Sequence, residues 1–322
     1  MKTPTLALLG CMLLAGCGGS GAAGSPSDAG GTPSDAGEAA FRIVGYVTDT
    51  GVTATEDQIQ LLTHLNYAFA LPRADGSLVD LANPGKLQAY VQTAHAHGVK
   101  VLISIGGWGW DGEFEQLAAL SSSRATFVSA VTAMVDDFGL DGADVDWEYP
   151  DPGASSEAFT ALMTELRAAL PADKLVTAAV AAVGPGADGV AAEVFAQVDF
   201  LNLMAYDGAG SHHAPMTYAE DTLAYWADRG LPPAQSVLGV PFYARPSEVS
   251  YRELVRADPA AALADEIEFH TVAVNYNGPA TIGLKTRLAM ARASGIMIWT
   301  ITDDTSDETS LLRAIRVALD GG

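Results

Sequence analysis

Residues 141–150 read DGADVDWEYP, and the carboxylic acids Asp144, Asp146 and Glu148 occupy alternate positions in this stretch. Residues two apart on a β-strand point to the same face of a sheet, roughly 6.6 Å apart along the backbone. The positions between the acids carry apolar side chains, namely Ala143, Val145 and Trp147. The pattern predicts a buried strand that turns its acids inward and its apolar side chains toward covering helices.

Seven further runs of apolar or β-branched residues predict strands on either side of this one. The eight expected strands are Arg42–Thr48, Thr63–Ala70, Lys100–Gly106, Gly142–Glu148, Lys174–Ala181, Asp199–Tyr206, Ser236–Tyr243 and Gly295–Ile301. Amphipathic helices are expected between them, for example over Pro84–Gly98 and Ser123–Gly139. Buried strands separated by helices indicate parallel pairing.

Eight such units in about 280 residues predict an α/β fold of the (β/α)8 TIM barrel type. The alternative is an open doubly wound sheet. No glycine-rich phosphate loop of the required spacing follows the first strand, which disfavours that alternative.

The composition restricts the class of partner. The chain has 322 residues, of which 49 % are hydrophobic, so it can bury a large core. Its 17 basic and 39 acidic residues give a formal net charge of -22. Nucleic acids and anionic membrane surfaces attract cationic proteins, so both are excluded as electrostatic partners. A neutral polysaccharide remains compatible with this charge.

The N-terminus has the features of an export signal. Lys2 precedes an apolar run, Leu6–Gly16, that is too short to span a bilayer. The sequence LAGC at Leu14–Cys17 resembles the lipobox of bacterial lipoproteins. The resemblance implies a signal peptide over 1–16, acylation of Cys17, and an exported protein held by lipid on a bacterial membrane in the cell envelope. The alternative is an ordinary signal peptide that contains a cysteine.

The next segment, 17–40, consists mostly of Gly, Ser, Ala, Asp and Pro, and the pentapeptide PSDAG occurs in it twice. Such a composition is typical of a flexible tether. The catalytic barrel is therefore expected over 41–322. Both cysteines, Cys11 and Cys17, precede it, so the barrel contains no disulfide and depends on packing for its stability.

Three inward acids without a neighbouring Lys or Arg cannot all ionise at low cost. Desolvation and mutual repulsion predict that at least one stays protonated near neutral pH. Glu148 lies at the carboxyl end of its strand, which in a barrel is the mouth where chemistry takes place. A solvated acidic edge strand is disfavoured by the apolar residues between the acids. A divalent-cation site is disfavoured because no neighbouring strand end offers the additional cluster of acids or histidines that such a site would need.

The stretch DGADVDWEYP resembles the DGxDxDxE signature of glycoside hydrolase family 18, the chitinase family. Six other segments, in the same order as in the family, resemble its strand motifs: Gly45–Tyr46, Asn66–Ala70, Ser104–Trp108, Met204–Asp207, Gly239–Arg245 and Met297–Asp304. The likeness runs from Phe41 to the C-terminus. Only about fifty residues separate Arg245 from Gly295, which leaves no room for the large domain that some relatives insert between strands 7 and 8. A shallower cleft is expected.

The resemblance implies substrate-assisted, retaining catalysis, in which the 2-acetamido group of the sugar replaces a protein nucleophile. Glu148 would act as general acid and then as base. Asp146 would orient the acetamido N–H, and Tyr206 would donate a hydrogen bond to its carbonyl. Asp144 would share a proton with Asp146. No cofactor and no metal are implied.

The resemblance also implies a set of sugar-binding residues. Trp299 would form the floor on which the sugar stacks, and Met204 and Asp207 would line the same subsite. The cleft walls are expected to include Tyr46, Phe69, Trp108, Tyr243 and Arg245. His212 and His213 follow the sixth strand and are expected to form a surface or substrate-contact loop.

The expected function is hydrolysis of β-1,4-linked N-acetylglucosamine polymers, such as chitin or chito-oligosaccharides, by a monomeric enzyme. Two alternatives remain open. One is an endo-β-N-acetylglucosaminidase acting on glycoprotein glycans or on peptidoglycan. The other is an inactive sugar-binding lectin, which is disfavoured because Glu148, Asp146 and Tyr206 are all present.

Overall fold

The structure is a computed structural model that describes residues 41–321. The expected signal peptide 1–16, the tether 17–40 and the lipidation site Cys17 lie outside the described residues. In the described part of the chain, no helix is long and apolar enough to cross a membrane.

Eight parallel strands close into a barrel, in the order β1-β12-β7-β6-β5-β4-β3-β2. Their bounds are β1 Arg42–Thr48, β2 His64–Ala70, β3 Lys100–Gly106, β4 Gly142–Asp146, β5 Leu175–Ala181, β6 Phe200–Met204, β7 Ser236–Pro241 and β12 Gly295–Trp299. Each strand pairs in parallel with both neighbours. The closed TIM barrel is confirmed, and the open sheet is wrong.

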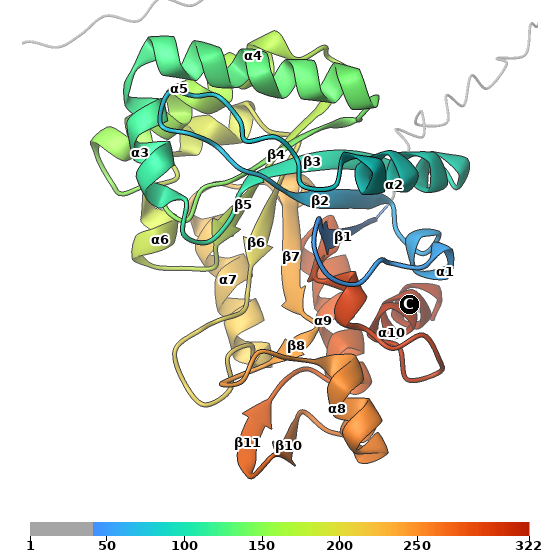
Figure 1. The fold of residues 1–322 in the computed structure, drawn as a ribbon. Coiled ribbons are helices and arrows are strands. Elements are labelled where there is room, and N and C mark those ends of the chain that lie inside the picture. Colours follow the sequence, from blue (N-terminus) through green and yellow to red (C-terminus); the bar gives the residue numbers. More distant parts are fainter. Residues whose placement is uncertain (1–40, 322) are drawn as a thin grey trace, which may run out of the picture. The chain divides into compact units, whose positions relative to one another are not determined.

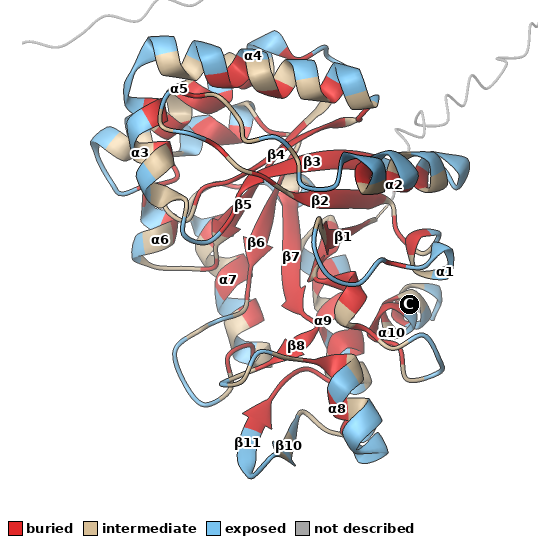
Figure 2. Cartoon of the chain, viewed as in Figure 1, coloured by how far each residue is buried: buried red, intermediate tan, exposed pale blue. Residues whose placement is uncertain are grey.

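The helices lie outside the strands (Figure 1). They are α1 Glu56–Ile59, α2 Pro84–Ala96, α3 Asp111–Ala119, α4 Ser121–Phe138, α5 Ala154–Ala169, α6 Pro185–Asp188, α7 Met216–Asp228, α8 Tyr251–Ala257, α9 Pro279–Arg292 and α10 Leu311–Asp320. Figure 2 shows that the strands are almost entirely buried, whereas the helices are buried only on the side facing them. This difference explains why the strands are mostly apolar on both faces and the helices are amphipathic.

The outward side chains of β4 fix the direction of its acids. Trp147, at the end of this strand, is buried between two helices and stacks on Phe114 of α3 at 5.3 Å between ring centroids. Its ring also meets Phe159 of α5 edge-on, and its Nε1–H donates to Asp111 at 2.8 Å. Because side chains alternate along a strand, anchoring Trp147 outward leaves Asp146 and Glu148 on the inner side.

Four strands, β4, β6, β7 and β12, end two residues earlier than the sequence pattern suggests, and the first two of them bear on the site. The last parallel partner of β4 is Asp146, so Glu148 lies beyond the hydrogen-bonded ladder. β6 ends at Met204. Tyr206 lies two residues beyond this end, and its backbone N–H donates to the carbonyl of Met204. Both residues therefore lie at the mouth of the barrel, where the chain leaves the sheet.

A small insertion separates β7 from α9, in place of a large domain. It contains two antiparallel pairs, β8 Tyr243–Ala244 with β9 Val249–Ser250, and β10 Glu266–Phe269 with β11 Val272–Asn275, together with α8. Ser250 caps α8 through a capping box with Glu253. The expected absence of a large inserted domain is confirmed, and the insertion forms one side of the barrel mouth.

Glycines permit a tight turn where β3 ends. Gly106 has a φ of +111°, and a Cβ there would lie 2.3 Å from the carbonyl oxygen of Asp146. Gly107 has a φ of +88°, and a Cβ there would contact the ring of Phe69 at 2.6 Å. Residues other than glycine rarely adopt such φ values. The pair of glycines thus lets the end of β3 approach the acid-bearing strand closely.

Gly106→Ala should therefore destabilise the fold more than a positive φ alone explains. The matched control is Gly109→Ala, because Gly109 has a similar φ of +93° and nothing within 4 Å of its Cβ position. We expect Gly106→Ala to lower the free energy of unfolding by about 1–3 kcal/mol more than the control, measured by urea denaturation. Equal losses would show that the close approach to Asp146 does not constrain this turn.

Candidate active site

A cavity of about 850 Å³ opens at the carboxyl ends of the barrel strands. Asp146, Glu148 and Tyr206 line it, and so do seven of the expected sugar-binding residues: Phe69, Trp108, Met204, Asp207, Tyr243, Arg245 and Trp299. Its size is within the range of small-molecule and oligosaccharide clefts. The barrel thus brings together residues that are up to 230 positions apart in the sequence.

Asp144 lies below the cavity, completely buried in the barrel interior. Its Oδ2 accepts hydrogen bonds from the hydroxyls of Tyr46 at 2.7 Å and Ser104 at 2.8 Å. Its Oδ1 accepts from the Thr177 hydroxyl at 2.6 Å and from the Asn202 amide at 3.2 Å. Four donors thus converge on the four lone-pair directions of one carboxylate.

This arrangement corrects the expectation that Asp144 and Asp146 share a proton. No hydrogen bond joins them among residues 41–321, because both oxygens of Asp144 are already occupied. Burial raises the pKa of Asp144, and the four hydrogen bonds act in the opposite direction. Burial and the nearby Asp144 also raise the pKa of Tyr46 well above its usual range, so Tyr46 keeps its proton and remains a donor. The surroundings of Asp144 fit an ionised carboxylate.

Asp146 has the opposite surroundings. Its side chain is buried, and its Oδ1 has no hydrogen-bond partner within the described residues. Burial raises the pKa of Asp146 well above its usual range, and the charges of Glu148 and Asp144 add to this effect. An unpartnered buried carboxylate is costly unless it is neutral. Asp146 therefore holds a proton at neutral pH more readily than Asp144 does.

Glu148 is the outermost acid and faces the cavity. Burial raises the pKa of Glu148; a hydrogen bond from Tyr149 opposes the rise, and the negative charge of Asp207 adds to it. These directions agree with the expectation that at least one acid of the row stays protonated near neutral pH.

Tyr206 points its hydroxyl into the site without a strong acceptor. Within residues 41–321 the only hydrogen-bond contact of this hydroxyl is a long one, 3.9 Å, to the sulfur of Met297. Burial raises the pKa of Tyr206 well above its usual range, so the hydroxyl keeps its proton. A ligand acceptor placed in the cavity would find this donor free.

One wall of the cavity is built around Asp207. Arg245 donates to both of its oxygens, with Nε at 2.8 Å from Oδ1 and Nη2 at 2.9 Å from Oδ2. The hydroxyl of Tyr243 donates to Oδ2 at 2.8 Å. Burial by itself would raise the pKa of Asp207, but hydrogen bonds from His213, Arg245 and Tyr243 hold it well below its usual range. Asp207 is therefore a fixed negative charge at the edge of the cavity.

Aromatic rings form the floor and one rim of the cavity. Trp299 stacks on Phe69 at 5.5 Å between ring centroids with an interplanar angle of 25°. Trp108 is 80 % exposed, which leaves its ring open to a ligand. Tyr46 does not line the cavity, in contrast to the sequence-based expectation, because its hydroxyl is bound to Asp144 and its ring lies beneath Trp299 at 5.5 Å. Its place is under the floor, where it orients an acid.

Sequence reasoning did not identify several cavity residues. Tyr149 directly follows Glu148 and Asp303 lies in the motif Met297–Asp304, so both were within reach of the motif argument. The others come from the small insertion, which carries no family motif: Glu248, Ser250, Arg252 and Glu253. They show that the insertion supplies one end of the cavity.

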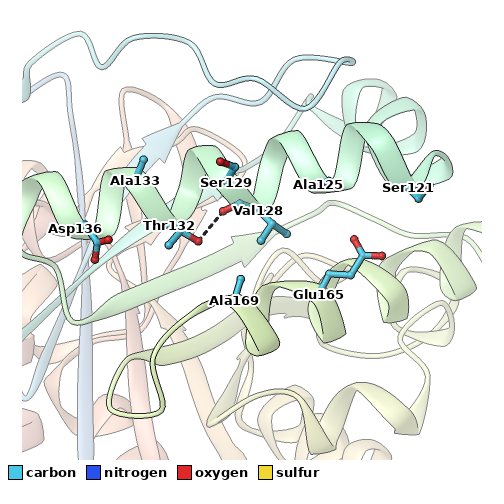
Figure 3. Close-up of a pocket in the computed structure, with 9 residues that line it drawn as sticks. All are labelled: Ser121, Ala125, Val128, Ser129, Thr132, Ala133, Asp136, Glu165 and Ala169. Atoms are coloured by element: carbon cyan, nitrogen blue, oxygen red, sulfur yellow. Dashed lines mark hydrogen bonds between the residues drawn. The ribbon is translucent and has the colours of Figure 1, made fainter.

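A second hollow lies on the outside of the barrel between α4 and α5 (Figure 3). Small side chains such as Ala125, Ser129 and Ala169 line it, together with the acids Asp136 and Glu165, and Glu165 is paired with Arg124 at 2.8 Å. It contains no nucleophile with an adjacent base. Nowhere in residues 41–321 do three His, Cys, Asp or Glu side chains gather closely enough to hold a metal ion.

The buried proton on Asp146 predicts a pH-dependent stability. Well below pH 4 Asp146 is protonated in both the folded and the unfolded chain; as the pH rises, the unfolded chain loses this proton first, so the wild type loses stability. Asp146→Asn removes this loss. Its advantage in the free energy of unfolding should grow from pH 4 to pH 8, to roughly 0.5–2 kcal/mol, measured by urea denaturation.

The control is Asp80→Asn, which changes an exposed loop acid. We expect its effect on stability to stay the same across this pH range. A difference between Asp146→Asn and wild type that does not vary with pH would show that Asp146 is not held protonated.

Comparison with known proteins agrees with this geometry. Residues 42–304 match the family described as Glycosyl hydrolases family 18. Chitinase 1 of Aphanocladium album is 28 % identical over 234 residues, which cover 57 % of this chain and 55 % of that protein. The chain thus spans about half the length of this curated relative.

Two solved structures are similar to this chain in both fold and sequence. The family 18 chitinase ChiB from the chitin utilization locus of Flavobacterium johnsoniae is 28 % identical and has a TM-score of 0.72, covering 87 % of this chain and 94 % of that chain. A mutant family 18 chitinase from Cycas revoluta, in complex with (GlcNAc)4, is 25 % identical and has a TM-score of 0.74, covering 87 % and 99 %. The matched span includes the barrel, the row of acids and the cavity, and this chain therefore belongs to glycosyl hydrolases family 18.

Proposed function

We propose that the protein hydrolyses β-1,4-linked N-acetylglucosamine polymers, chitin or chito-oligosaccharides, by substrate-assisted catalysis with retention of configuration. The observation that carries the proposal is the pair Asp146 and Glu148. Both have raised pKa values, caused mainly by burial, and both face a cavity floored by Trp299. A proton is thus held where a glycosidic oxygen would lie above an aromatic platform.

Glu148 is the proposed general acid. It is the acid of the row nearest the mouth of the barrel, and burial together with the charge of Asp207 keeps its pKa raised. It gives its proton to the leaving glycosidic oxygen and then, as a carboxylate, takes a proton from the incoming water. A raised pKa favours the first step, because the acid must be protonated when the substrate binds.

Asp146 and Tyr206 are proposed to act on the 2-acetamido group. The Asp146 carboxyl has a buried oxygen without a partner, which can accept the acetamido N–H, and the Tyr206 hydroxyl is free to donate to the acetamido carbonyl. Held in this way, the carbonyl oxygen attacks the anomeric carbon as the glycosidic bond breaks. Water then attacks the anomeric carbon from the face that the leaving group has left and opens the oxazolinium ion. The product therefore keeps the configuration of the substrate.

The relatives support this substrate class. The curated relative and both solved structures are named chitinases, and one of them was solved with (GlcNAc)4. We propose an N-acetylglucosamine glycan as the partner of this chain as well. An endo-β-N-acetylglucosaminidase acting on glycoprotein glycans or peptidoglycan would use the same acid and the same acetamido chemistry.

A side-by-side assay separates these substrates. The full chain is given chito-oligosaccharides, high-mannose glycopeptides and peptidoglycan, and the products are followed by NMR, which also reports the anomer formed first. We expect cleavage of chito-oligosaccharides with release of the β-anomer. Release of the α-anomer, or cleavage of glycopeptides alone, would contradict the proposal.

Glu148→Gln should abolish turnover while leaving binding intact, because the amide keeps the shape of the side chain but cannot donate the required proton. We expect kcat to fall by about 10²–10⁴-fold and the Kd for a chito-oligosaccharide to change little, measured by product analysis and calorimetry. The matched control is Glu253→Gln, which changes an exposed acid at the insertion end of the same cavity. Turnover by Glu148→Gln at the rate of the control would remove Glu148 from the mechanism.

We also propose that the protein is exported and anchored to a bacterial membrane through a lipid on Cys17. The support is the lipobox-like sequence LAGC at Leu14–Cys17 and the tether-like composition that follows it. Cells fed labelled palmitate should yield labelled protein from wild type and unlabelled protein from Cys17→Ser. Equal labelling of Cys11→Ser and wild type provides the control, and an unlabelled wild type would leave only an ordinary export signal.

A further inference from the structure

His213 lies in a position that the proposed mechanism does not use. It belongs to the loop after β6, its side chain is 3 % exposed, and its Nδ1 is 3.1 Å from Oδ1 of Asp207. Its Nε2 is buried and has no hydrogen-bond partner within residues 41–321. A buried histidine that contacts a cavity-lining acid on one side only calls for a physical explanation.

The hydrogen bonds around Asp207 supply that explanation. Arg245 and Tyr243 provide three donors to its two oxygens, and Oδ1 has room for one more. A charge-assisted bond from Nδ1–H of His213 completes the set of four. The backbone N–H of Asp207 also lies near Nδ1, at the longer distance of 3.4 Å. We assign the proton to Nδ1 because its contact with Oδ1 is the shorter one, 3.1 Å, and because Nε2 has no acceptor within residues 41–321.

The backbone of the loop depends on the same residue. Asp207 has a φ of 55°, in the left-handed region that a non-glycine residue adopts only when its surroundings require it. The N–H of Gly208 donates to the carbonyl of His213 at 2.9 Å, which closes the loop next to Asp207. Both the side chain and the backbone of His213 therefore hold Asp207 in its present conformation.

His213 is in turn anchored from the far side. The carbonyl of Ala214, the next residue, accepts from Lys285 Nζ at 2.7 Å and from Asn277 Nδ2 at 3.0 Å, and all three residues are completely buried. A buried lysine and asparagine that both bind one loop carbonyl leave the loop little freedom. The donor that His213 presents to Asp207 is thus rigidly placed.

We propose that His213 is a positioning residue for the general acid, acting through Asp207; this rests on the proposed function of Glu148. Asp207 and Glu148 line the same cavity, and the negative charge of Asp207 there raises the pKa of Glu148. His213 supplies the fourth donor to this charge and fixes the loop that carries it. Without His213, Asp207 keeps the donors from Arg245 and Tyr243 but loses the donor and the loop contact that fix its position, and we expect its charge to act less strongly on Glu148, which then loses its proton at a lower pH.

Other charged groups near His213 also act on this region, and all remain in place in the His213 variants below. They are Asp207 and His212 on its own loop, Tyr243 and Arg245 with Glu248 on the β8 side, and Lys285, which binds the carbonyl of Ala214; Lys285, Asp265 and Tyr276 also act on His212. Differences between variants of His213 therefore report on its own contact with Asp207.

Carboxyl ¹³C NMR of the full chain, labelled at Glu and assigned with Glu148→Gln, measures the titration of Glu148 without any turnover. We expect Glu148 to titrate at lower pH in His213→Leu than in wild type. His213→Asn, whose amide can place an N–H near the position of Nδ1, should restore the wild-type titration. The control is His212→Leu, which removes an imidazole and one hydrogen bond from the same loop but no donor to Asp207, and it should titrate as wild type does.

An unchanged titration of Glu148 in folded His213→Leu would overturn the proposal, and so would an equal change in His212→Leu. Should His213→Leu fail to fold, His213→Ala removes the same donor and is judged by the same criteria. A lower melting temperature with an unchanged titration would assign His213 a purely structural role, which also contradicts the proposal.

The rate at which the variants turn over a substrate of the wild type is a second measurement of this effect. In His213→Leu, kcat/KM should fall roughly threefold on the alkaline side of the pH profile, the scale of a partly exposed charge pair, and stay within about twofold of wild type on the acidic side. If the wild type cleaves none of the tested glycans, the proposed function fails, while the titration of Glu148 still decides the role of His213.

Discussion

The hydrogen bonding of Asp144 is the constraint on which the site depends. Donors from four barrel strands, Tyr46 of β1, Ser104 of β3, Thr177 of β5 and Asn202 of β6, meet on one buried carboxylate. These four hydrogen bonds fill its lone pairs and oppose the rise in its pKa that burial causes, an arrangement that fits an ionised carboxylate in the centre of the barrel. The next acid, Asp146, has no such donors, so the proton of the row resides nearer the mouth.

The fold places the three acids in different surroundings because successive side chains of a barrel strand point alternately inward and outward. Trp147 packs outward between α3 and α5, which turns the neighbouring acids inward. Asp144 then lies among donors, Asp146 among groups that do not bind it, and Glu148 at the cavity. Across the cavity, Asp207 adds a second fixed anion, held by donors from its own loop and from the insertion. The charge of Asp144 raises the pKa of Asp146, and the charge of Asp207 raises the pKa of Glu148, so each anion favours a proton on one of the two outer acids.

Much of this site could be predicted from the sequence, for a physical reason. A period-two pattern of acids and apolar residues specifies which side chains share a face, and the motifs at strand ends must meet at the mouth of a closed barrel. The donors to Asp144 had no such signal. Thr177 and Asn202 are ordinary polar residues in apolar strands, and only the barrel register brings them to Asp144. The prediction that Tyr46 lines the cleft wall was wrong for the same reason. Its depth in the barrel, which the sequence does not reveal, places it under the cavity floor.

The central claim is that the row of acids keeps its innermost member ionised and its proton near the mouth. Neutron diffraction from the deuterated protein at neutral pH locates carboxyl deuterons directly. The account predicts none on either oxygen of Asp144, with deuterons on the surrounding hydroxyls pointing toward it, and one on Asp146 or Glu148. A deuteron on Asp144, with both outer acids bare, would contradict it.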